Sequence, residues 1–294
     1  MFLFPDPKTI DIAGVKIGGQ PGENPPVLAG TIFYERHKIL TGAGFDKNAA
    51  LGLINKQLEM SDETKIPSMI NVFGDSVKTF RERIDFVADN CRLPIMIDSP
   101  DYGVRIAALK HVDEAGLSKR VIYNSINLSV NREEIEALKK SDVDSAIILA
   151  YNPVDSSLEG KLRFLEKEGA FGKGMLDIAK EAGIKNILVD TAMTPLYHGA
   201  GIALKGIIAC KSKFGYPTGC ATHNAAVSWQ WLSGRPTKSL VDVSSNIIPI
   251  VLGADFVLFG PIEYADRVFD IAAFAEIAIE EAMDGMTNIR KIEL

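Results

Sequence analysis

The chain has 294 residues, of which 47% are apolar and 24% charged, so it is long enough to bury a large core and has an ordinary globular composition. Its net charge of −6 and its lack of basic blocks argue against a nucleic-acid-binding surface. No stretch of about 18 apolar residues is present, and Asp6 lies where a signal peptide would need a positive flank. Three scattered cysteines indicate reduced thiols. We therefore expect a cytoplasmic protein without a membrane insertion.

From residue 8 onward, short β-rich runs alternate with amphipathic segments. A hairpin over residues 8–24 precedes the first long strand, and Asn131 is expected to cap a helix. The expected strands cover residues 27–34, Ser68–Phe73, 93–97, 120–128, 145–151, Asn186–Asp190, 217–224 and 255–259. The first expected helix begins at Asp46 and ends near Met60. The next three begin near Ser76, beside Pro100 and after Asn131. The later helices are expected over residues 160–168 and 174–183, in a glycine-rich segment after His198, and over Ala265–Met283, where Phe274 is among the residues expected to pack.

Each of the eight long strands ends in a polar residue and is followed by a helix. These strand ends lie near Glu35, Asp75, Asp98, Asn127, Asp155, Asp190, Asn224 and Glu263. This alternation predicts a (β/α)₈ TIM barrel, with the hairpin closing its N-terminal end and residues 1–294 forming one domain. Such barrels carry their chemistry at the C-terminal ends of the strands.

Several kinds of site find little support in the sequence. His37, His111, His198 and His223 are far apart, and no HExxH or CxxC motif occurs, so no metal site is expected. The glycine-rich segment 18–22 lies outside any strand-to-helix turn, and the loops after the last two strands lack a phosphate-binding glycine pattern. No Gly-x-Ser-x-Gly nucleophile motif is present. The acids and amides at the strand ends suit a neutral, hydrogen-bonding heterocycle better than a phosphate or a metal ion.

Five strand-end residues remain as candidates for binding such a ligand: Asp98, Asn124, Asn127, Asp190 and Asn224. Ser99 can cap the helix that follows, which leaves Asp98 without a structural task. An amide within a buried strand, such as Asn124, costs free energy unless it is hydrogen-bonded, so it is either a binding group or a buried structural amide.

Asp190 ends an apolar strand, and its helix begins later, although a capping role stays open. Asn224 is equally well placed as the N-cap of the next helix. The remaining strand-end acids are interpreted as caps, salt-bridge partners or rim residues: Glu35, Asp75, Asp155 and Glu263.

With these residues identified, the chain resembles the H-subunit family of tetrahydromethanopterin S-methyltransferase, one of the families of pterin-binding corrinoid methyltransferases. The similarity extends over nearly the whole chain. It is carried by residues 17–23 (IGGQPGE), 33–39 (FYERHKI), 60–62 (MSD), 98–99 (DS), 124–127 (NSIN), 141–150 (SDVDSAIILA), 174–175 (GM), 223–224 (HN) and 260–263 (GPIE). The family includes a bacterial branch that methylates tetrahydrofolate during glycine betaine demethylation.

The resemblance implies transfer of a methyl group between a corrinoid cobalt and N5 of a tetrahydropterin, in a barrel that forms a homodimer. The pterin edge offers N–H donors, which suit the carboxylates of Asp98 and Asp190, while Asn124 and Asn127 suit mixed donor–acceptor edges. Asn224 matches the asparagine that lies near N5 in related enzymes, so Asn224 and Asp98 are the expected catalytic residues. We expect tetrahydrofolate as the pterin, with tetrahydromethanopterin as the alternative.

No histidine stands in an Asp-x-His-x-x-Gly motif, which base-off corrinoid sites commonly use. We therefore expect the corrinoid to arrive on a separate corrinoid protein that docks over the barrel mouth. Trp229 and Trp231 are expected to be core residues, with a docking role as the alternative.

Two other functions stay open from the sequence. One is a non-catalytic subunit that carries the pterin within a larger assembly. The other is a dihydropteroate-synthase-like enzyme using the same pocket, which would need anion-binding groups for its pyrophosphate leaving group.

Overall fold

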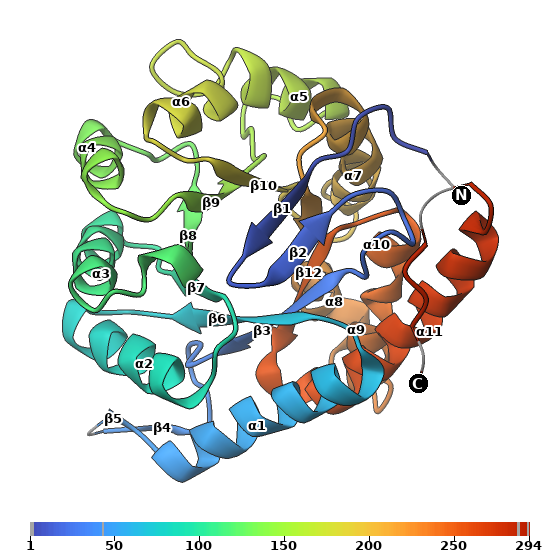
Figure 1. Cartoon of the computed structure of the whole chain (residues 1–294), viewed down its shortest axis with the longest axis horizontal. Helices are drawn as coiled ribbons and strands as arrows, with labels where there is room; N and C mark the ends of the chain where they lie inside the picture. Colours follow the sequence, from blue (N-terminus) through green and yellow to red (C-terminus); the bar gives the residue numbers. More distant parts are fainter. Residues whose placement is uncertain (1–2, 43, 287–288, 293) are drawn as a thin grey trace.

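The computed structural model describes residues 3–42, 44–286, 289–292 and 294, and it confirms the predicted (β/α)₈ barrel (Figure 1). Parallel strands close the barrel in the order β10-β11-β12-β3-β6-β7-β8-β9. These strands are β3 (Val27–Ile32), β6 (Ser68–Phe73), β7 (Ile95–Asp98), β8 (Val121–Ile126), β9 (Ser145–Leu149), β10 (Asn186–Asp190), β11 (Thr218–Cys220) and β12 (Phe256–Pro261). Apolar, buried side chains fill the inside of the barrel below its C-terminal end, as expected of a parallel sheet covered on both faces.

An outer layer of helices surrounds the barrel. The helices are α1 (Lys47–Thr64), α2 (Val77–Asn90), α3 (Tyr102–Glu114), α4 (Arg132–Lys140), α5 (Leu158–Glu166), α6 (Met175–Glu181), α7 (Ala200–Phe214), α8 (Thr222–Ser228), α9 (Lys238–Ser245), α10 (Ile247–Val251) and α11 (Ala265–Met283). As predicted, Asn131 caps α4, its side chain accepting a hydrogen bond from the Glu134 amide. None of the helices in the described ranges is long and apolar enough to cross a membrane.

The predicted N-terminal hairpin is confirmed and closes one end of the barrel (Figure 1). It consists of β1 (Thr9–Ile12) and β2 (Val15–Gly18). Ile12 and Ile17 are buried in one cluster with residues inside the barrel, including Met96 and Phe256. A second small antiparallel pair, β4 (Leu40–Thr41) and β5 (Gly44–Phe45), precedes α1. The hairpin therefore covers the N-terminal end of the barrel and leaves the C-terminal ends of the strands uncovered by it.

Three local predictions were wrong. The seventh strand is short, because residues from Thr222 onward form α8, and the Thr222 hydroxyl donates a buried hydrogen bond to Asn246 at the end of α9. Asp101, rather than Ser99, caps α3 by accepting from the Val104 amide. Phe274 is 71% exposed on the outer face of α11 instead of packing inward.

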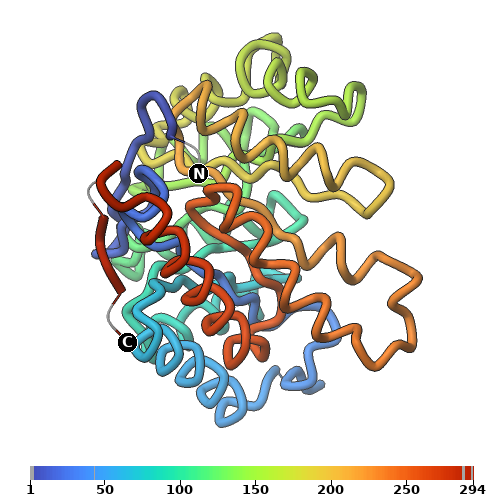
Figure 2. The backbone as a smooth tube through the Cα atoms, turned by 90° about the vertical axis from the view of Figure 1, so that its right-hand side faces the viewer, coloured from blue at the N-terminus to red at the C-terminus, as the bar shows by residue number. Residues whose placement is uncertain are grey.

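The open end of the barrel carries the longest connections. Figure 2 shows the segments that follow β10 and β11 extending from one side of the molecule, with the chain ends on the other side. These segments, residues 191–199 and 229–237, therefore lie beside the C-terminal ends of the strands, where barrel enzymes place their sites.

Candidate functional site

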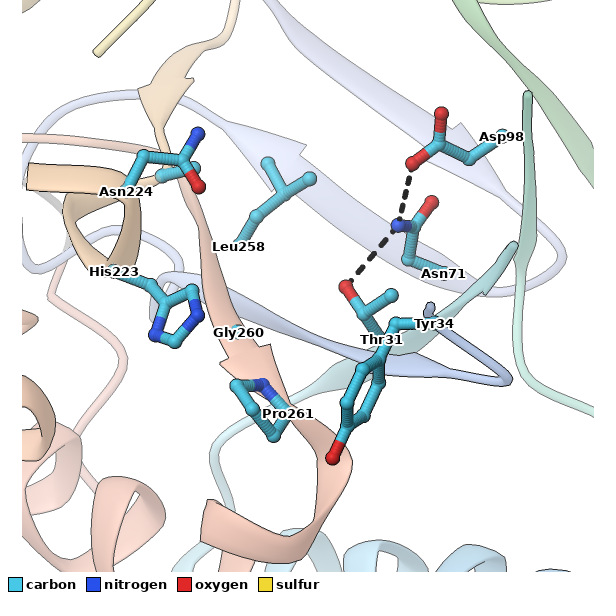
Figure 3. A pocket seen from close by; sticks show the side chains of 10 residues that line it. Thr31, Tyr34, Asn71, Asp98, His223, Asn224, Leu258, Gly260 and Pro261 are labelled. Atoms are coloured by element: carbon cyan, nitrogen blue, oxygen red, sulfur yellow. Dashed lines mark hydrogen bonds between the residues drawn. The ribbon is translucent and has the colours of Figure 1, made fainter. Parts of the chain in front are cut away.

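A cavity of about 300 Å³ opens at the C-terminal ends of the barrel strands (Figure 3). Polar side chains from several strands and loops face it, together with the apolar Leu258. Its lining residues are Thr31, Tyr34, Asn71, Asp98, Ala221, His223, Asn224, Leu258, Gly260 and Pro261. This volume lies at the lower end of the range for small-molecule sites, which suits a compact ring rather than an extended ligand.

A chain of hydrogen bonds connects four adjacent strands along one wall of the cavity. The Asn71 amide on β6 donates to Thr31 Oγ1 on β3 at 3.2 Å and to Asp98 Oδ2 on β7 at 3.0 Å. Its carbonyl accepts from Asn124 Nδ2 on β8 at 3.4 Å. Since Asn71 is only 2% exposed, this chain fixes the direction in which the Asp98 carboxylate points.

Asp98 is a carboxylate with little water around it. Burial raises its pKa, although the hydrogen bond from Asn71 and the positive charge of Arg105 act in the opposite direction. Arg105 on α3 also donates to the carbonyl of Ser99 and pairs with the fully buried Glu134 at 2.6 Å. This buried network holds the segment after β7 in place and leaves Asp98 free to face the cavity.

Asp190 is the last residue of β10, three strands round the barrel from β7. The pKa of Asp190 is raised to about 6: burial and the negative charge of Asp98 raise it, while the backbone amide of Ala192 and the charge of Lys161 act in the opposite direction. Its Oδ1 accepts from Ala192 N at 2.7 Å. Both carboxylates lie at the C-terminal ends of their strands, but Asp98 lines the cavity and Asp190 is not among the residues that line it.

A buried lysine supports this side of the site. Lys161 on α5 is 4% exposed and donates to the backbone carbonyls of Ala150, Thr191 and Ala192 at 3.0, 2.8 and 3.4 Å. Its ammonium group therefore ties together the segments that follow β9 and β10. It also supplies the positive charge nearest to Asp190.

The other wall is formed by α8 and by the end of β12. Asn224 lies within the first turn of α8, with an exposed side chain at the cavity. Within the described residues its amide has no hydrogen-bond partner in the protein, so it is available to a ligand. His223 lies beside it, and its Nδ1 is 2.9 Å from Asp242 of α9.

The two remaining candidates differ in their surroundings. Asn124 takes part in the hydrogen-bond chain of the cavity wall, through Asn71. Asn127 is used within its own loop, where its Oδ1 accepts from the amide and the hydroxyl of Ser129 at 2.9 and 2.7 Å. Its proposed contact with a ligand would therefore have to replace these bonds.

Several residues at the site escaped the sequence interpretation. Asn71 carried the same signal as Asn124, an amide inside an apolar strand, and was overlooked. Tyr34 donates to Glu263 Oε1 at 2.8 Å, and His37, which stacks on Tyr34, brings its Nε2 to 3.0 Å from the same oxygen. Burial alone would raise the Glu263 pKa, but the hydrogen bonds from His37 and Tyr34 outweigh it and lower that pKa.

The four strand-end acids that were interpreted as caps, salt-bridge partners or rim residues have charged or hydrogen-bonding partners in the structure. Glu35 is exposed and lies 3.5 Å from Arg36, Asp75 and Asp155 pair with arginines, and Glu263 is held as described. Trp231, expected to be a core residue, is 54% exposed. It stacks on Trp229 at 4.8 Å and lies under the guanidinium of Arg235.

Comparison with known proteins agrees with the resemblance seen in the sequence. The family described as the tetrahydromethanopterin S-methyltransferase MtrH subunit matches residues 6–290. The chain belongs to this family.

Two relatives illustrate the similarity. The H subunit of the putative methyltransferase mtx from Methanosarcina barkeri is 47% identical over 293 residues, covering 96% of this chain and 94% of the relative. The H subunit of tetrahydromethanopterin S-methyltransferase from Methanopyrus kandleri is 45% identical over 303 residues, with the same coverage. Both relatives match nearly from end to end, so the whole barrel is shared.

Among solved structures, the barrel is similar to dihydropteroate synthases. The enzyme from Yersinia pestis aligns with a TM-score of 0.66, covering 94% of this chain and 99% of the enzyme, at 13% sequence identity. The enzyme from Stenotrophomonas maltophilia aligns with a TM-score of 0.61 at 18% identity, covering 96% of this chain and 100% of that chain. At these identities the likeness concerns the fold alone.

The hydrogen bond from Asn71 to Asp98 yields a prediction about acidity. In Asn71→Ala the carboxylate loses a donor that stabilises its charged form, so the pKa of Asp98 should rise above its value in the unmodified protein. Titration of ¹³C-labelled aspartate carboxyl groups by NMR, with Asp98 assigned by its loss in Asp98→Asn, measures this shift.

Thr31→Val is the matched control, since it removes the other acceptor of the Asn71 amide and leaves the bond to Asp98 intact. It should move the Asp98 pKa much less. An equal shift in both variants, or a lower pKa in Asn71→Ala, would contradict the proposed hydrogen-bond chain.

Proposed function

We propose that this protein transfers a methyl group between the cobalt of a corrinoid carried by a partner protein and N5 of a tetrahydropterin bound in the cavity. The observation that supports this most is the cavity at the C-terminal ends of the strands, which is lined by the Asp98 carboxylate, the amide of Asn224 and apolar groups, with Asp190 at the end of β10 at the same end of the barrel. A flat, uncharged ring with several N–H donors on one edge suits such a space.

The donor pattern of the ligand supports the same assignment. The pyrimidine edge of a tetrahydropterin carries N–H groups at N3, at the 2-amino group and at N8, and ionised carboxylates only accept hydrogen bonds. Asp98 and Asp190 would bind this edge. Asn124 and Asn127 would serve the mixed positions, Asn127 after giving up its bonds to Ser129.

The relatives favour tetrahydromethanopterin over tetrahydrofolate as the pterin. Family members from methanogens carry tetrahydromethanopterin in their names, and they match this chain at more than 40% identity. We therefore take tetrahydromethanopterin, the alternative drawn from the sequence, as the substrate, with tetrahydrofolate as the second candidate.

Methyl transfer at this site requires no covalent intermediate with the protein. The lone pair of N5 attacks the methyl carbon, and the Co–C bond breaks with its electron pair remaining on cobalt. Asn224, which is free at the cavity, would orient N5 and its hydrogen bonds, so its contribution would be positional and electrostatic.

The corrinoid partner would approach over the open end of the barrel. A 300 Å³ cavity holds a pterin ring but not a corrin macrocycle in addition, so cobalt has to be presented from outside. Tyr197 and Trp231 are exposed beside this opening, with the half-buried Trp229 stacked on Trp231, and this aromatic surface supports docking there. The names of the relatives, which describe them as subunits, also suit action within an assembly.

We further propose that the protein is a homodimer, as the resemblance implied. Large apolar side chains are exposed on α9, α10 and α11, which pack against one another. They are Leu240, Ile248, Val251 and Phe274. Apolar groups gathered on neighbouring helices are typical of an interface between protomers.

The pterin assignment is tested by titrating the protein with tetrahydromethanopterin and with tetrahydrofolate. Loss of a hydrogen bond to a charged group is worth about 1.5–3 kcal/mol. Asp98→Asn and Asp190→Asn should therefore each weaken pterin binding by roughly tenfold to a hundredfold. Asn224→Ala should lower the rate of methyl transfer from methylcobalamin more than it lowers pterin affinity.

Glu35→Gln is the control, because this exposed acid lies outside the cavity and should leave binding unchanged. Unchanged affinity in both aspartate variants would remove the carboxylates from the ligand site. If Asn224→Ala loses affinity and keeps its rate, the proposed role at N5 is wrong.

The dimer is tested by sedimentation velocity. Phe274→Asp places a charge on the exposed apolar surface and should weaken self-association by at least about tenfold. Val154→Asp makes the same change at a side chain that is 94% exposed on a loop after β9 and should have no effect. A monomeric unmodified protein, or equal effects of the two variants, would contradict the proposed interface.

A further inference from the structure

His223 is the imidazole at the cavity wall, and a buried carboxylate holds it from behind. Its Nδ1 lies 2.9 and 3.0 Å from the two oxygens of Asp242, a residue that is 2% exposed. An ionised carboxylate can only accept, so Nδ1 carries the proton and donates it to Asp242. In the neutral ring the lone pair is therefore on Nε2.

The surrounding chain is shaped to keep the ring in this position. Gly260 has a φ of +92°, and a Cβ at this residue would come within 2.4 Å of His223 Cγ, so only glycine leaves room for the imidazole. Thr222 ties the start of α8 to Asn246, immediately after the helix that carries Asp242. The position of the imidazole is thus fixed by the start of α8, by the Asp242 carboxylate and by the glycine in β12, which has no side chain.

Nε2 is the part of this side chain that remains for a ligand. Within the described residues no protein group bonds to it, and His223 lines the cavity next to Asn224. Figure 3 shows the ring on the same wall as Asn224, facing the space that Asp98 borders from the other side. A group that can both accept and donate a proton therefore faces the bound ring.

The proposed reaction needs such a group. When N5 takes up the methyl group it carries a positive charge, and the proton of its N–H bond has to leave. In the reverse direction N5 must gain a proton before the methyl group is lost. Asn224 cannot supply or remove a proton at ordinary pH, and the carboxylates of Asp98 and Asp190 are assigned to the other edge of the ring.

We infer that His223, oriented by Asp242, exchanges the proton of pterin N5 during methyl transfer. This inference rests on the proposed function. As N5 forms its bond to the methyl carbon and the Co–C electron pair stays on cobalt, the N5–H bond breaks and its proton passes to His223 Nε2. In the opposite direction the imidazolium returns this proton to N5 as Co(I) takes the methyl group.

Other charged and titratable groups surround the pair and belong to the same pH response. Tyr264, from the turn after β12, packs edge-on against the His223 ring at 6.4 Å. Burial raises the pKa of Tyr264, the charges of Asp242 and Glu263 raise it further, and the charge of Arg267 on α11 lowers it. Tyr34 and Asp98 complete this set of groups at the cavity.

The test is single-turnover methyl transfer from methylcobalamin to the tetrahydropterin, with the appearance of cob(I)alamin as the readout. The rate is measured from pH 5 to about 9, the range in which imidazole titrates. Removal of a general base or acid costs about 10²–10⁴-fold. His223→Gln should lose at least about a hundredfold in rate. Its pterin affinity should change by less than about threefold, which is under 0.7 kcal/mol. The pH dependence due to the imidazole should disappear.

Asp242→Asn keeps the shape of the pair but reverses the hydrogen bond, because its amide donates to Nδ1 and moves the ring proton to Nε2. It should slow pterin methylation by at least about tenfold with pterin affinity retained. In His223→Ala, added imidazole should restore part of the rate.

His111→Gln is the matched control. His111 on α3 also pairs with a carboxylate, Asp85, at 2.6 Å and is 17% exposed, but it lies away from the cavity. It should keep the rate and the pH profile of the unmodified protein. If His223→Gln does the same, the inference is wrong while the proposed function stands. If the unmodified protein transfers no methyl group to either pterin, the proposed function fails, and this inference fails with it.

Discussion

Burial of two carboxylates at the C-terminal end of one barrel is the constraint on which the site depends. Asp98 ends β7 and Asp190 ends β10, three strands further round the barrel, and each has a raised pKa because burial disfavours its charge. Such a pair costs free energy unless something stabilises it. Asn71, Arg105, the Ala192 amide and Lys161 stabilise it in part, and a ligand rich in N–H donors would complete the stabilisation.

The rest of the barrel can be understood from this requirement. The hairpin fills the N-terminal end with Ile12 and Ile17, and the cavity lies at the opposite end. Two buried cations at that end bind other parts of the protein: Lys161 donates to backbone carbonyls, and Arg105 pairs with Glu134. The cavity itself is left with free acceptors on one side and with an amide and an imidazole on the other. This division matches a ring that is bound by one edge and reacts at another.

The sequence predicted the barrel because alternation of apolar strands and amphipathic helices is a local pattern. It also predicted that Asp98, Asp190 and Asn224 lie at one end of the barrel, since parallel strands bring their ends together; of these, Asp98 and Asn224 line the cavity. The importance of Asn71 was missed even though it carried the signal used for Asn124.

The pairing of His223 with Asp242 was not predictable, because it depends on how α8 packs against α9. The extra turn of helix that takes up Asn224 was missed as well, since it depends on the buried bond from Thr222 to Asn246. Spacing along the chain carries no information on such contacts.

The central claim is that Asp98 and Asp190 bind the pyrimidine edge of a tetrahydropterin. The most direct measurement is a crystal structure of the protein soaked with tetrahydromethanopterin. Our account predicts oxygens of both carboxylates within about 2.7–3.2 Å of ring N–H groups, with N5 facing the wall formed by α8. A ring bound elsewhere, such as on the surface of Trp229 and Trp231, with both carboxylates free of it, would contradict the account.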